Sequence, residues 1–370
     1  MKIIQWAFPY LPTMGGREIF VQRLSQSLAG QGHDIHVIAP PPAKNELTDP
    51  NYVHLDKFPV HRHDLLKAML AKDSVKVEAT QQRLILDLTQ IQPDVIHVHT
   101  IGPEIVMLRD ALRQAKIDAK FVYTHHGLSE DHTFWRYSLS MVDAVVAISE
   151  HSRNQILQLV PFIATKLIVI RNGVPVTPQY TPLGVSQQEI FAFGRLSAEK
   201  GFHLLLEAWA AMQSNTRGLQ LVIAGEGVDG RSLRAQSEKL GITATVSFPG
   251  WLNQAQISQK LVDSRLVVVP STFEEPFGLV AAEAHAKARP VIASRIGGLP
   301  EIVIDGETGF LVEPSSSQTL AAALVGVMHD IPQLQSMGEK AHTRAINELN
   351  WDSCVREYEM LFKRLVVSRG

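Results

Sequence analysis

Short, almost wholly apolar runs alternate with longer segments of helical periodicity along most of this chain, and this alternation restricts the fold more than any other feature. Strands that are apolar on both faces belong to parallel sheets covered by helices on each side, so the sequence predicts an α/β fold. The strands are predicted at residues 2–7, 34–39, 94–99, 120–124, 143–148, 167–170, 189–194, 219–224, 245–248, 266–269 and 290–293. The helices are predicted at residues 16–30, 64–90, 200–213, 229–240, 254–263, 278–288, 316–349 and 351–366.

The alternation pauses at residues 173–188, a stretch with three prolines, two glycines and few charges that is typical of an interdomain linker. A chain of 370 residues is long enough for two domains. We therefore predict two doubly wound, Rossmann-like domains, at residues 1–172 and 189–350, which face each other across a cleft. Ligands of such domains bind at the carboxyl ends of the strands.

Composition excludes several other classes of protein. The charges nearly cancel, with 35 basic and 37 acidic residues, which argues against a dedicated nucleic-acid binder. The single cysteine, Cys354, excludes an intrachain disulfide and a C-x-x-C site. No apolar run approaches the roughly 20 residues of a spanning helix, and the first 16 residues lack the pattern of a signal peptide. These features predict a cytoplasmic protein.

Gly15 and Gly16 lie between the first predicted strand and the first predicted helix. Glycines at this place let backbone N–H groups approach an anion at a helix N-terminus. A tight turn between strand and helix explains the same two residues more simply. The spacing matches neither a dinucleotide-binding fingerprint nor a P-loop, so hydride transfer and P-loop chemistry lose their usual signatures.

Arg195 and Lys200 follow the predicted strand 189–194, in the sequence FAFGRLSAEKG. Two cations at the carboxyl end of a strand suit a diphosphate, because a guanidinium binds it with two hydrogen bonds and an ammonium acts as a point charge. Taken in isolation, a solvated turn explains these residues better.

Glu275 and Glu283 flank the start of the predicted helix 278–288 and are too far apart to share a proton. They suit two acceptors that read hydroxyl groups on one elongated ligand. Between them, the backbone of Phe277, Gly278 and Leu279 would present N–H groups at the helix N-terminus, where a phosphate is stabilised. Helix capping by Glu275 and solvent exposure of Glu283 are the alternatives.

Two weaker motifs remain. The turn at residues 224–228, which contains Glu226 and Gly227, could seat a nucleobase, although a plain turn explains it better. His97 and His99 share one face of a predicted strand and could bind zinc or iron. No carboxylate with metal-ligand spacing accompanies them, so hydrogen-bonded histidines at a strand end are favoured and no metal site is predicted.

The segment 57–83 contains four lysines, two arginines and two histidines, together with apolar residues at 65, 66, 69 and 70. This pattern could form a contact with an anionic membrane surface. The interspersed acidic residues favour an ordinary solvated helix face.

In their order along the chain, these motifs resemble the retaining glycosyltransferases of family 4, which have the GT-B fold. The resemblance covers nearly the whole chain, and the E-x7-E segment at 275–283 together with GRLSAEKG at 194–201 is its most specific part. Its other motifs are GGRE, HVHT, THHG, AISE, RNGV, AGEG, PVIAS and GGLPEIV.

The resemblance implies a role for each matching residue. Arg195 and Lys200 would contact the diphosphate of a nucleotide sugar, Glu275 the hydroxyls of the transferred sugar, and Glu283 the ribose. His126 would point from the first domain toward the sugar, and the final helix, residues 351–370, would pack back on that domain. The remaining donor-binding positions implied are Gly15, Gly16, Gly194, Glu226, Gly227, Phe277, Gly278 and Leu279.

The implied activity is a retaining, metal-independent transfer of a hexose from a nucleotide-diphosphate sugar to a hydroxyl group of a glycan, glycolipid or small molecule. A UDP-sugar is favoured over a GDP-sugar, and no further cofactor is needed. Val228 and Pro175 depart from the family pattern near the nucleotide turn and the linker, so the base stays open. The acceptor would be read by loops such as 40–63 and 127–136, which carry no recognisable code, and the oligomeric state is not predicted.

Two alternatives stay open at this point. A nucleotide-sugar epimerase on a similar scaffold would convert the donor without an acceptor. A non-catalytic nucleotide-sugar binder is disfavoured by the presence of Arg195, Lys200, Glu275 and Glu283.

Overall fold

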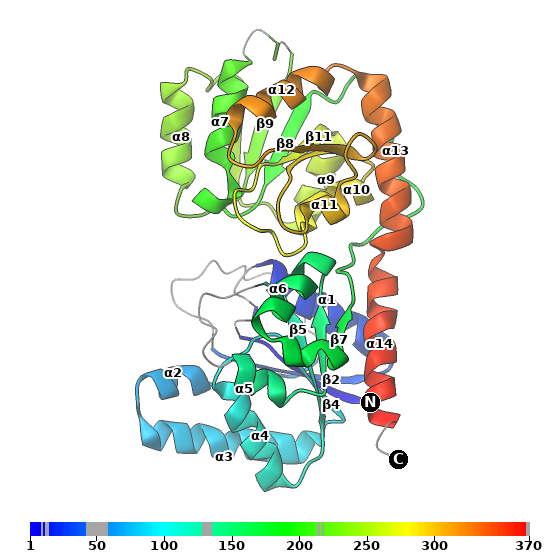
Figure 1. The fold of residues 1–370 in the computed structure, drawn as a ribbon. Helices are drawn as coiled ribbons and strands as arrows, with labels where there is room; N and C mark the ends of the chain where they lie inside the picture. Colours follow the sequence, from blue (N-terminus) through cyan, green and yellow to red (C-terminus); the bar gives the residue numbers. More distant parts are fainter. Residues whose placement is uncertain are drawn as a thin grey trace. The chain divides into compact units, whose positions relative to one another are not determined.

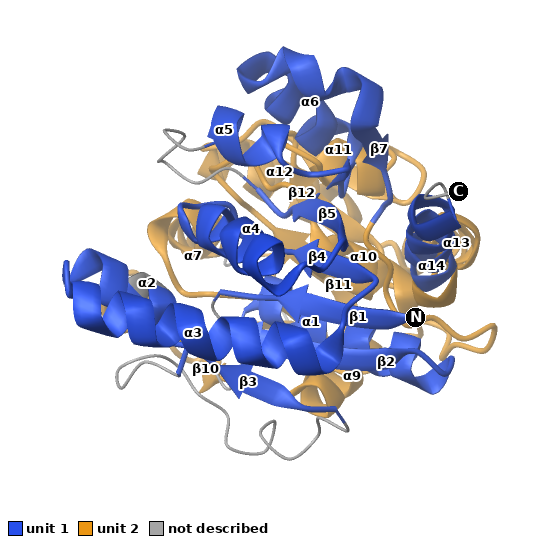
Figure 2. Ribbon diagram, turned by 90° about the horizontal axis from the view of Figure 1, so that it is seen from below, with its two compact units in different colours: residues 1–171, 354–370 blue, residues 172–353 orange. Residues whose placement is uncertain are grey.

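The computed structural model describes residues 1–8, 10–11, 15–41, 58–127, 135–212, 215–216 and 218–367, apart from the side chain of Leu66. The chain forms two compact units (Figure 2). Unit 1 comprises residues 1–171 and 354–370, and unit 2 comprises residues 172–353. Parts of the two predicted acceptor loops, residues 42–57 and 128–134, lie outside the described residues.

Unit 1 contains a parallel sheet of seven strands in the order β3-β2-β1-β4-β5-β6-β7, with helices on its faces (Figure 1). The strands β1, β4, β5 and β6 are almost wholly buried, as expected for a sheet covered on both sides. The strands are β1 (Lys2–Trp6), β2 (Asp34–Ala39), β3 (Val60–Arg62), β4 (Val95–Val98), β5 (Lys120–His125), β6 (Ala144–Ala147) and β7 (Leu167–Val169). The helices are α1 (Gly16–Gly30), α2 (Leu65–Leu70), α3 (Ser74–Ile91), α4 (Glu104–Ala115), α5 (Trp135–Ser140), α6 (Glu150–Leu159) and the 3-10 helix η2 (Pro161–Lys166).

Unit 2 contains a parallel sheet of six strands in the order β10-β9-β8-β11-β12-β13. The strands are β8 (Glu189–Phe193), β9 (Gln220–Ala224), β10 (Val246–Gly250), β11 (Ser264–Val269), β12 (Val291–Ser294) and β13 (Gly309–Val312). The helices are the 3-10 helix η3 (Ala198–Lys200), α7 (Phe202–Ala211), α8 (Gly230–Lys239), α9 (Gln254–Asp263), α10 (Leu279–Ala286), α11 (Leu299–Ile302), α12 (Ser317–Val327) and α13 (Ile331–Glu348). Helix α14 (Trp351–Val367) begins in unit 2 and continues in unit 1.

The predicted fold is confirmed: both units are doubly wound α/β structures with parallel sheets. In each, the strand order reverses beside a central strand, between β1 and β4 in unit 1 and between β8 and β11 in unit 2. Such a reversal opens a crevice at the carboxyl ends of the two strands, because the connecting helices leave on opposite faces. This position in the fold is therefore the place to look for a site in each unit.

Several predicted boundaries were wrong. The helical pattern at 64–90 is two helices, α2 and α3, because Lys72 adopts a left-handed conformation and the Asp73 side chain caps α3. The pattern at 316–349 likewise divides at Asp330, which caps α13. The strands β3 and β13 were not predicted, since each is short, lies at a sheet edge and lacks a fully buried apolar run.

The chain passes between the units twice, and these two segments are hydrogen-bonded to each other. The Val174 N–H donates to the Leu349 carbonyl at 2.7 Å, and the Trp351 N–H donates to the Val174 carbonyl at 3.0 Å. A side chain at position 173 would place Cβ 2.6 Å from the Trp351 Cα atom, so glycine is required there. Residues 173–188 then lie within unit 2, where buried Arg289 donates to the Thr181 carbonyl at 3.0 Å.

Helix α14 contributes side chains to the core of unit 1. The Tyr358 hydroxyl lies 3.0 Å from the Thr124 Oγ1 atom on β5, and both residues are completely buried. His33 Nε2 lies 2.9 Å from a carboxylate oxygen of Glu359. Among the helices of the described residues, none is long and apolar enough to cross a bilayer.

Candidate active site

In unit 2, the loop after β8 places Arg195 and Lys200 at the carboxyl edge of the sheet. Arg195 is exposed, whereas Lys200 is the last residue of the one-turn helix η3 and is partly buried. The Lys200 Nζ atom donates to Glu275 Oε1 at 2.6 Å and lies 4.6 Å from the centre of the Phe273 ring. The first cation of the motif thus faces solvent, while the second is held in place by its neighbours.

Glu275 lies in the loop after β11, next to β8 in the sheet. Its Oε1 atom also accepts a hydrogen bond from the Ser271 hydroxyl at 2.7 Å. With 13% of its side chain exposed, against 23% for Lys200, this ion pair is screened less than one at the surface. Lys200 and Glu275, which are 75 positions apart in the sequence, therefore form one ion pair. Lys200 and Ser271 together orient the Glu275 carboxylate.

The carboxyl-edge loops of unit 2 pack backbone against backbone. Glycine is required at three positions because a Cβ atom would collide with a carbonyl oxygen. The distance would be 1.8 Å from Gly225 to the Gly194 oxygen, 2.3 Å from Gly227 to the Leu196 oxygen and 1.9 Å from Gly201 to the Pro270 oxygen. The Leu196 N–H donates to the Glu226 carbonyl at 2.9 Å, so the loops after β8 and β9 form one surface.

The loop from Glu275 to Gly278 packs in the same way against the segment after β12. The Gly298 N–H donates to the Glu275 carbonyl at 2.6 Å, and a Cβ atom on Gly297 would lie 2.5 Å from the Glu275 nitrogen. Gly278 has a φ of 99° and caps α10, and Phe277 is buried beside it. Leu279 begins α10, whose first-turn N–H groups lack intrahelical acceptors and carry the positive end of the helix dipole.

Glu283 lies on the second turn of α10 and is half-buried rather than exposed. Its Oε1 atom accepts a hydrogen bond from Gln254 Nε2 at 2.9 Å. Gln254 is the first residue of α9 and was not singled out by any motif. The structure thus fixes the second glutamate of the E-x7-E segment with a neutral donor, and the first with a cation.

In unit 1, Gly15 caps α1 and Gly16 begins it. The carboxylate of Glu18 folds back over this turn, because a Cβ atom on Gly15 would lie 2.2 Å from Glu18 Oε2. Arg17 Nη2 donates to the same carboxylate at 3.0 Å. Glu18 is buried, so this N-terminus is neutralised by the protein's own side chain.

His126 follows β5 and belongs to a chain of buried hydrogen bonds in unit 1. Its Nε2 atom lies 3.0 Å from His99 Nδ1, and His99 Nε2 lies 2.8 Å from Gln5 Oε1. On the neighbouring side, His97 Nε2 lies 2.7 Å from Thr124 Oγ1. Sequence motifs indicated the histidines but not Gln5, which looks like any residue of a buried strand.

Burial keeps these imidazoles neutral. Loss of hydration lowers the pKa of His97 to about 3. It also lowers the pKa of His99 and of His126 well below the usual range, and the positive charge of Arg17 acts in the same direction on both. The described residues hold no cluster of three or more histidine, cysteine or carboxylate side chains arranged for a metal ion.

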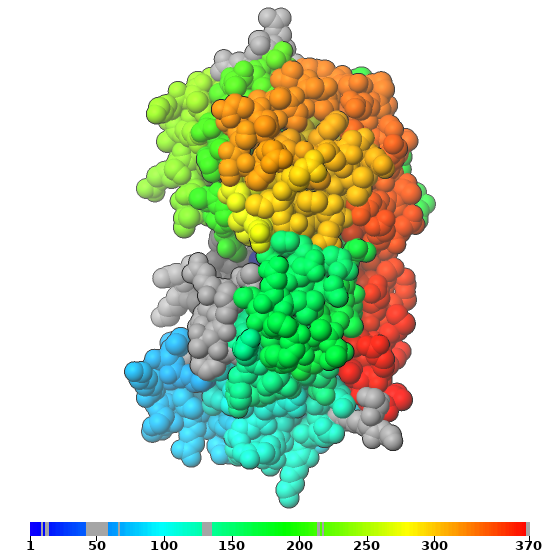
Figure 3. All heavy atoms as spheres, in the orientation of Figure 1, coloured from blue at the N-terminus to red at the C-terminus, as the bar shows by residue number. Residues whose placement is uncertain are grey.

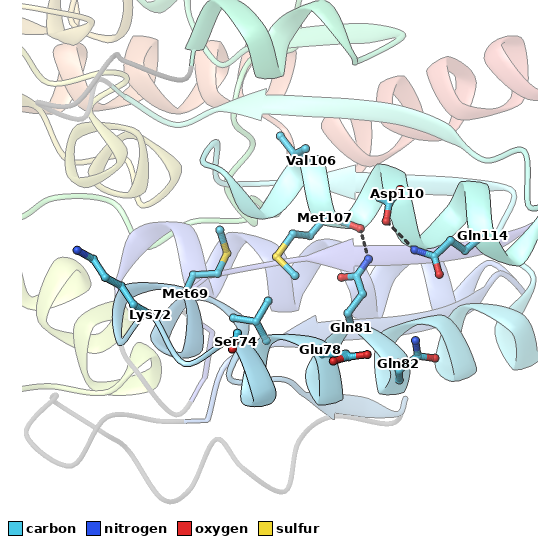
Figure 4. A pocket seen from close by; sticks show the side chains of 11 residues that line it. Met69, Lys72, Ser74, Glu78, Gln81, Gln82, Val106, Met107, Asp110 and Gln114 are labelled. Atoms are coloured by element: carbon cyan, nitrogen blue, oxygen red, sulfur yellow. Dashed lines mark hydrogen bonds between the residues drawn. The ribbon is translucent and has the colours of Figure 1, made fainter.

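A cavity of about 760 Å³ lies elsewhere in unit 1, between α2, α3 and α4 (Figure 4). Met69, Val77 and Met107 line it together with polar side chains such as Gln81, which donates to the Met107 carbonyl at 3.0 Å. None of the predicted site residues lines it. Its size does not make it the active site, because the polar groups suited to a sugar phosphate converge at the sheet edges instead.

Two protein-family models match successive halves of the chain. The model described as "Glycosyltransferase Family 4" matches residues 14–177, and the model described as "Glycosyl transferases group 1" matches residues 179–344. The chain belongs to glycosyltransferase family 4. It is therefore a glycosyltransferase, and the expected enzyme class is confirmed.

Relatives and solved structures agree with this family. The chain is 29% identical over 401 residues to the glycogen synthase of Mycobacterium tuberculosis, covering 100% of this chain and 96% of that protein. It is 25% identical to the N-acetyl-alpha-D-glucosaminyl L-malate synthase of Bacillus anthracis, covering 95% and 94%. The structure of Anabaena HepE in complex with UDP and glucose has a TM-score of 0.78 at 22% identity, covering 98% and 100%.

Proposed function

We propose that this glycosyltransferase takes a hexose from a nucleotide-diphosphate sugar and transfers it to a hydroxyl group with retention of configuration. The observation that carries the proposal is the Lys200–Glu275 ion pair at 2.6 Å, beside exposed Arg195 and the N-terminus of α10. Cleavage of a glycosyl phosphate bond builds negative charge on the diphosphate. Fixed positive groups stabilise that charge without reorganising.

The two glutamates divide the donor between them in this proposal. Glu275 accepts hydrogen bonds from hydroxyls of the transferred hexose, because Lys200 and Ser271 already hold its Oε1 atom in position. Glu283, one turn further along α10, accepts from the ribose hydroxyls. Glu226 and Gly227 lie on the neighbouring loop, where the base would rest.

We favour a UDP-sugar as the donor. The structurally similar HepE was crystallised with UDP and glucose, and the chain aligns with it over 98% of its length. Arg195, Lys200 and the N–H groups of Leu279 and its neighbours supply the positive charge that a divalent cation supplies in other transferases. The transfer is therefore proposed to need no added metal.

The proposed reaction proceeds on one face of the sugar. The bond between C1 and the phosphate oxygen breaks, the acceptor oxygen bonds to C1 from the same side, and the departing phosphate oxygen takes the acceptor's proton. Glu275 is a poor nucleophile for a double displacement, since its charge is paired with Lys200.

The test is a donor screen with the purified chain. Thermal shift with UDP-glucose, UDP-N-acetylglucosamine and GDP-mannose should reveal one stabilising donor, because a ligand bound to the folded state raises its midpoint. That donor should be hydrolysed slowly without an acceptor, in the presence of a chelator, and NMR should show the original anomeric configuration in the first product. Inversion, or activity only with added metal, would contradict the proposal. Conversion of the donor into its epimer would mark the isomerase instead.

The proposal extends to peripheral contact with an anionic membrane through one corner of unit 1 (Figure 3). At the junction of α2 and α3, the apolar side chains of Leu70 and Val75 are each 75% exposed. The same two helices carry the exposed lysines Lys67 and Lys76, which lie 3.8 Å from Asp64 and 3.1 Å from Asp73. An apolar tip among lysines suits an anionic bilayer surface. Vesicles rich in phosphatidylglycerol should co-sediment the protein, and Leu70→Ser should weaken this more than Leu86→Ser on the same surface of the unit. Absence of binding to such vesicles would remove the idea.

A further inference from the structure

His99 has no role in the proposed donor site, yet it lies between Gln5 and His126 in one hydrogen-bonded chain. Only 2% of His99 is exposed, and none of Gln5 is. His126 is partly exposed, so the chain of contacts runs from the core of unit 1 to its surface. The ring of Phe20 packs edge-on against both imidazoles, with centroids 6.2 Å from His99 and 5.3 Å from His126.

The order of donors and acceptors in this chain is determined by its buried end. Gln5 meets His99 with its amide oxygen, which can only accept, so His99 carries its proton on Nε2. A neutral imidazole has one proton, and His99 Nδ1 is then an acceptor. His126 Nε2, 3.0 Å away, must donate to it.

Both rings stay neutral at pH 7 because of their surroundings. Burial lowers the pKa of each imidazole well below 6.5, and Arg17 lowers it further. The other titratable groups that act on the pair are His97 on β4 and His125 on β5, and these also favour the neutral forms. A second proton, which would disrupt the order of donors, is therefore excluded near neutral pH.

We propose that His99 is a positioning residue which, together with Gln5, holds His126 as the Nε2–H tautomer, so that His126 Nδ1 accepts a hydrogen bond from a hydroxyl of the transferred sugar. This inference rests on the proposed function, together with the role that the family resemblance implies for His126. It assigns a chemical direction to the contact: the sugar donates and the protein accepts. A hydroxyl replaced by fluorine cannot donate and would lose the interaction.

The tautomer is measured directly by long-range nitrogen–proton NMR of the full chain labelled with ¹⁵N-histidine, with His126 assigned from His126→Asn. The wild-type spectrum should show the Nε2–H form of His126. This measurement needs neither a substrate nor a variant in the core. A proton on Nδ1 would overturn the inference, since it would mean that the Gln5 amide is reversed and donates to His99.

Variants of Gln5 test the link to catalysis. In Gln5→Leu, His126 should become a mixture of the Nε2–H and Nδ1–H forms, because His99 is no longer held in one form. The variant should lower kcat about 10-fold with little change in KM for the donor, as expected for one misdirected hydrogen bond. Gln5→Glu keeps an acceptor at His99 Nε2 but adds a negative charge that favours a second proton on His99, so the Nε2–H form of His126 should be lost at a higher pH than in the wild type. Thr124→Val is the control for loss of nearby buried hydrogen bonds, because it removes those of Thr124 to His97 and to Tyr358 and does not alter Gln5, His99 or His126.

The failures are distinguishable. An unchanged tautomer and unchanged kcat in Gln5→Leu would overturn the positioning role. Absence of turnover by the wild-type chain with every nucleotide sugar would refute the proposed function, while the tautomer remains measurable.

Discussion

The carboxyl edges of the two sheets occupy the same position in similar folds but are built from opposite chemistry. In unit 2 the edge holds charged groups, with Lys200 and Glu275 paired at 2.6 Å and Arg195 exposed. In unit 1 the corresponding edge holds a neutral, largely buried chain, with His99 between Gln5 and His126, and the charges of Arg17 and Glu18 beside it pair with each other. A common fold therefore fixes where a site lies, and the residues after each strand decide what it can bind.

The difference fits a division of work in sugar transfer. Charged groups at one edge suit the diphosphate of the proposed donor, whose charge would grow as the bond breaks. Neutral hydrogen-bonding groups at the other edge suit sugar hydroxyls. A hydroxyl group would compete poorly with water for a charged side chain. The following predictions test this contrast, beginning with the largest expected effect.

Lys200→Ala should lower the transfer rate by about 10²- to 10³-fold, the cost of losing one preorganised positive group. The matched control is Lys260→Ala, which removes an ion pair to Glu189 at 2.8 Å, at the opposite end of β8. The control should keep its turnover with the same donor in a steady-state assay. Equal losses of turnover in the two variants would show that the net charge of unit 2 matters, and that the position of Lys200 does not.

Gly201→Ala should destabilise unit 2 by about 2–5 kcal/mol, because it combines a φ of 68° with a Cβ atom 1.9 Å from the Pro270 oxygen. Gly32 in unit 1 has a similar φ of 87° but no atom within 4 Å of the added Cβ. Gly32→Ala should therefore cost only about 1–2 kcal/mol. Urea unfolding of both variants measures the difference, and similar losses would contradict the close packing of the loops in unit 2.

Acidification from pH 8 to pH 5 should destabilise unit 1 more than unit 2. The unfolded chain binds a proton on each histidine below pH 6.5, whereas burial lowers the pKa of His97 and of His285 to about 3 in the folded state. Each such residue lowers the free energy of unfolding by about 2 kcal/mol at pH 5. Unit 1 has two further strongly shifted imidazoles, His99 and His126, and is expected to lose more.

Hydrogen exchange of the two units at pH 8 and pH 5 checks this order. Protection factors, which correct for the slower intrinsic exchange at acid pH, should fall more in unit 1 than in unit 2, and His97→Leu should reduce this difference. Loss of protection first in unit 2 would show that the buried histidines of unit 1 are not the acid-sensitive groups.

Glu283→Ala should weaken nucleotide binding about 10-fold in calorimetry, because it removes a charged acceptor of hydroxyl hydrogen bonds. Glu238→Ala, on the exposed face of α8, serves as the control and should bind the nucleotide as the wild type does. Equal affinity in Glu283→Ala would refute a role in binding the ribose and would leave Glu283 with structural contacts such as the one to Gln254.

Much of this architecture could be predicted from the sequence. The central strands are long apolar runs, and runs of this kind fit only a parallel sheet covered on both faces. The edge strands β3 and β13 escaped because a strand with one neighbour needs no continuous apolar run. The division of each long helical pattern into two helices could not be predicted from periodicity. It depends on single residues, namely the left-handed Lys72 and the caps Asp73 and Asp330.

By itself, the sequence determined the fold class, the positions of most strands along the chain and the motifs that follow them, because these depend on local periodicity and on residue type. Only the tertiary structure decided which of those motifs touch. Lys200 reaches Glu275 because β8 and β11 are neighbours in the sheet although the two residues are far apart in the chain. Likewise, Tyr358 bonds Thr124 across 234 positions because α14 packs against unit 1. Contacts of this kind depend on strand order, which periodicity does not encode.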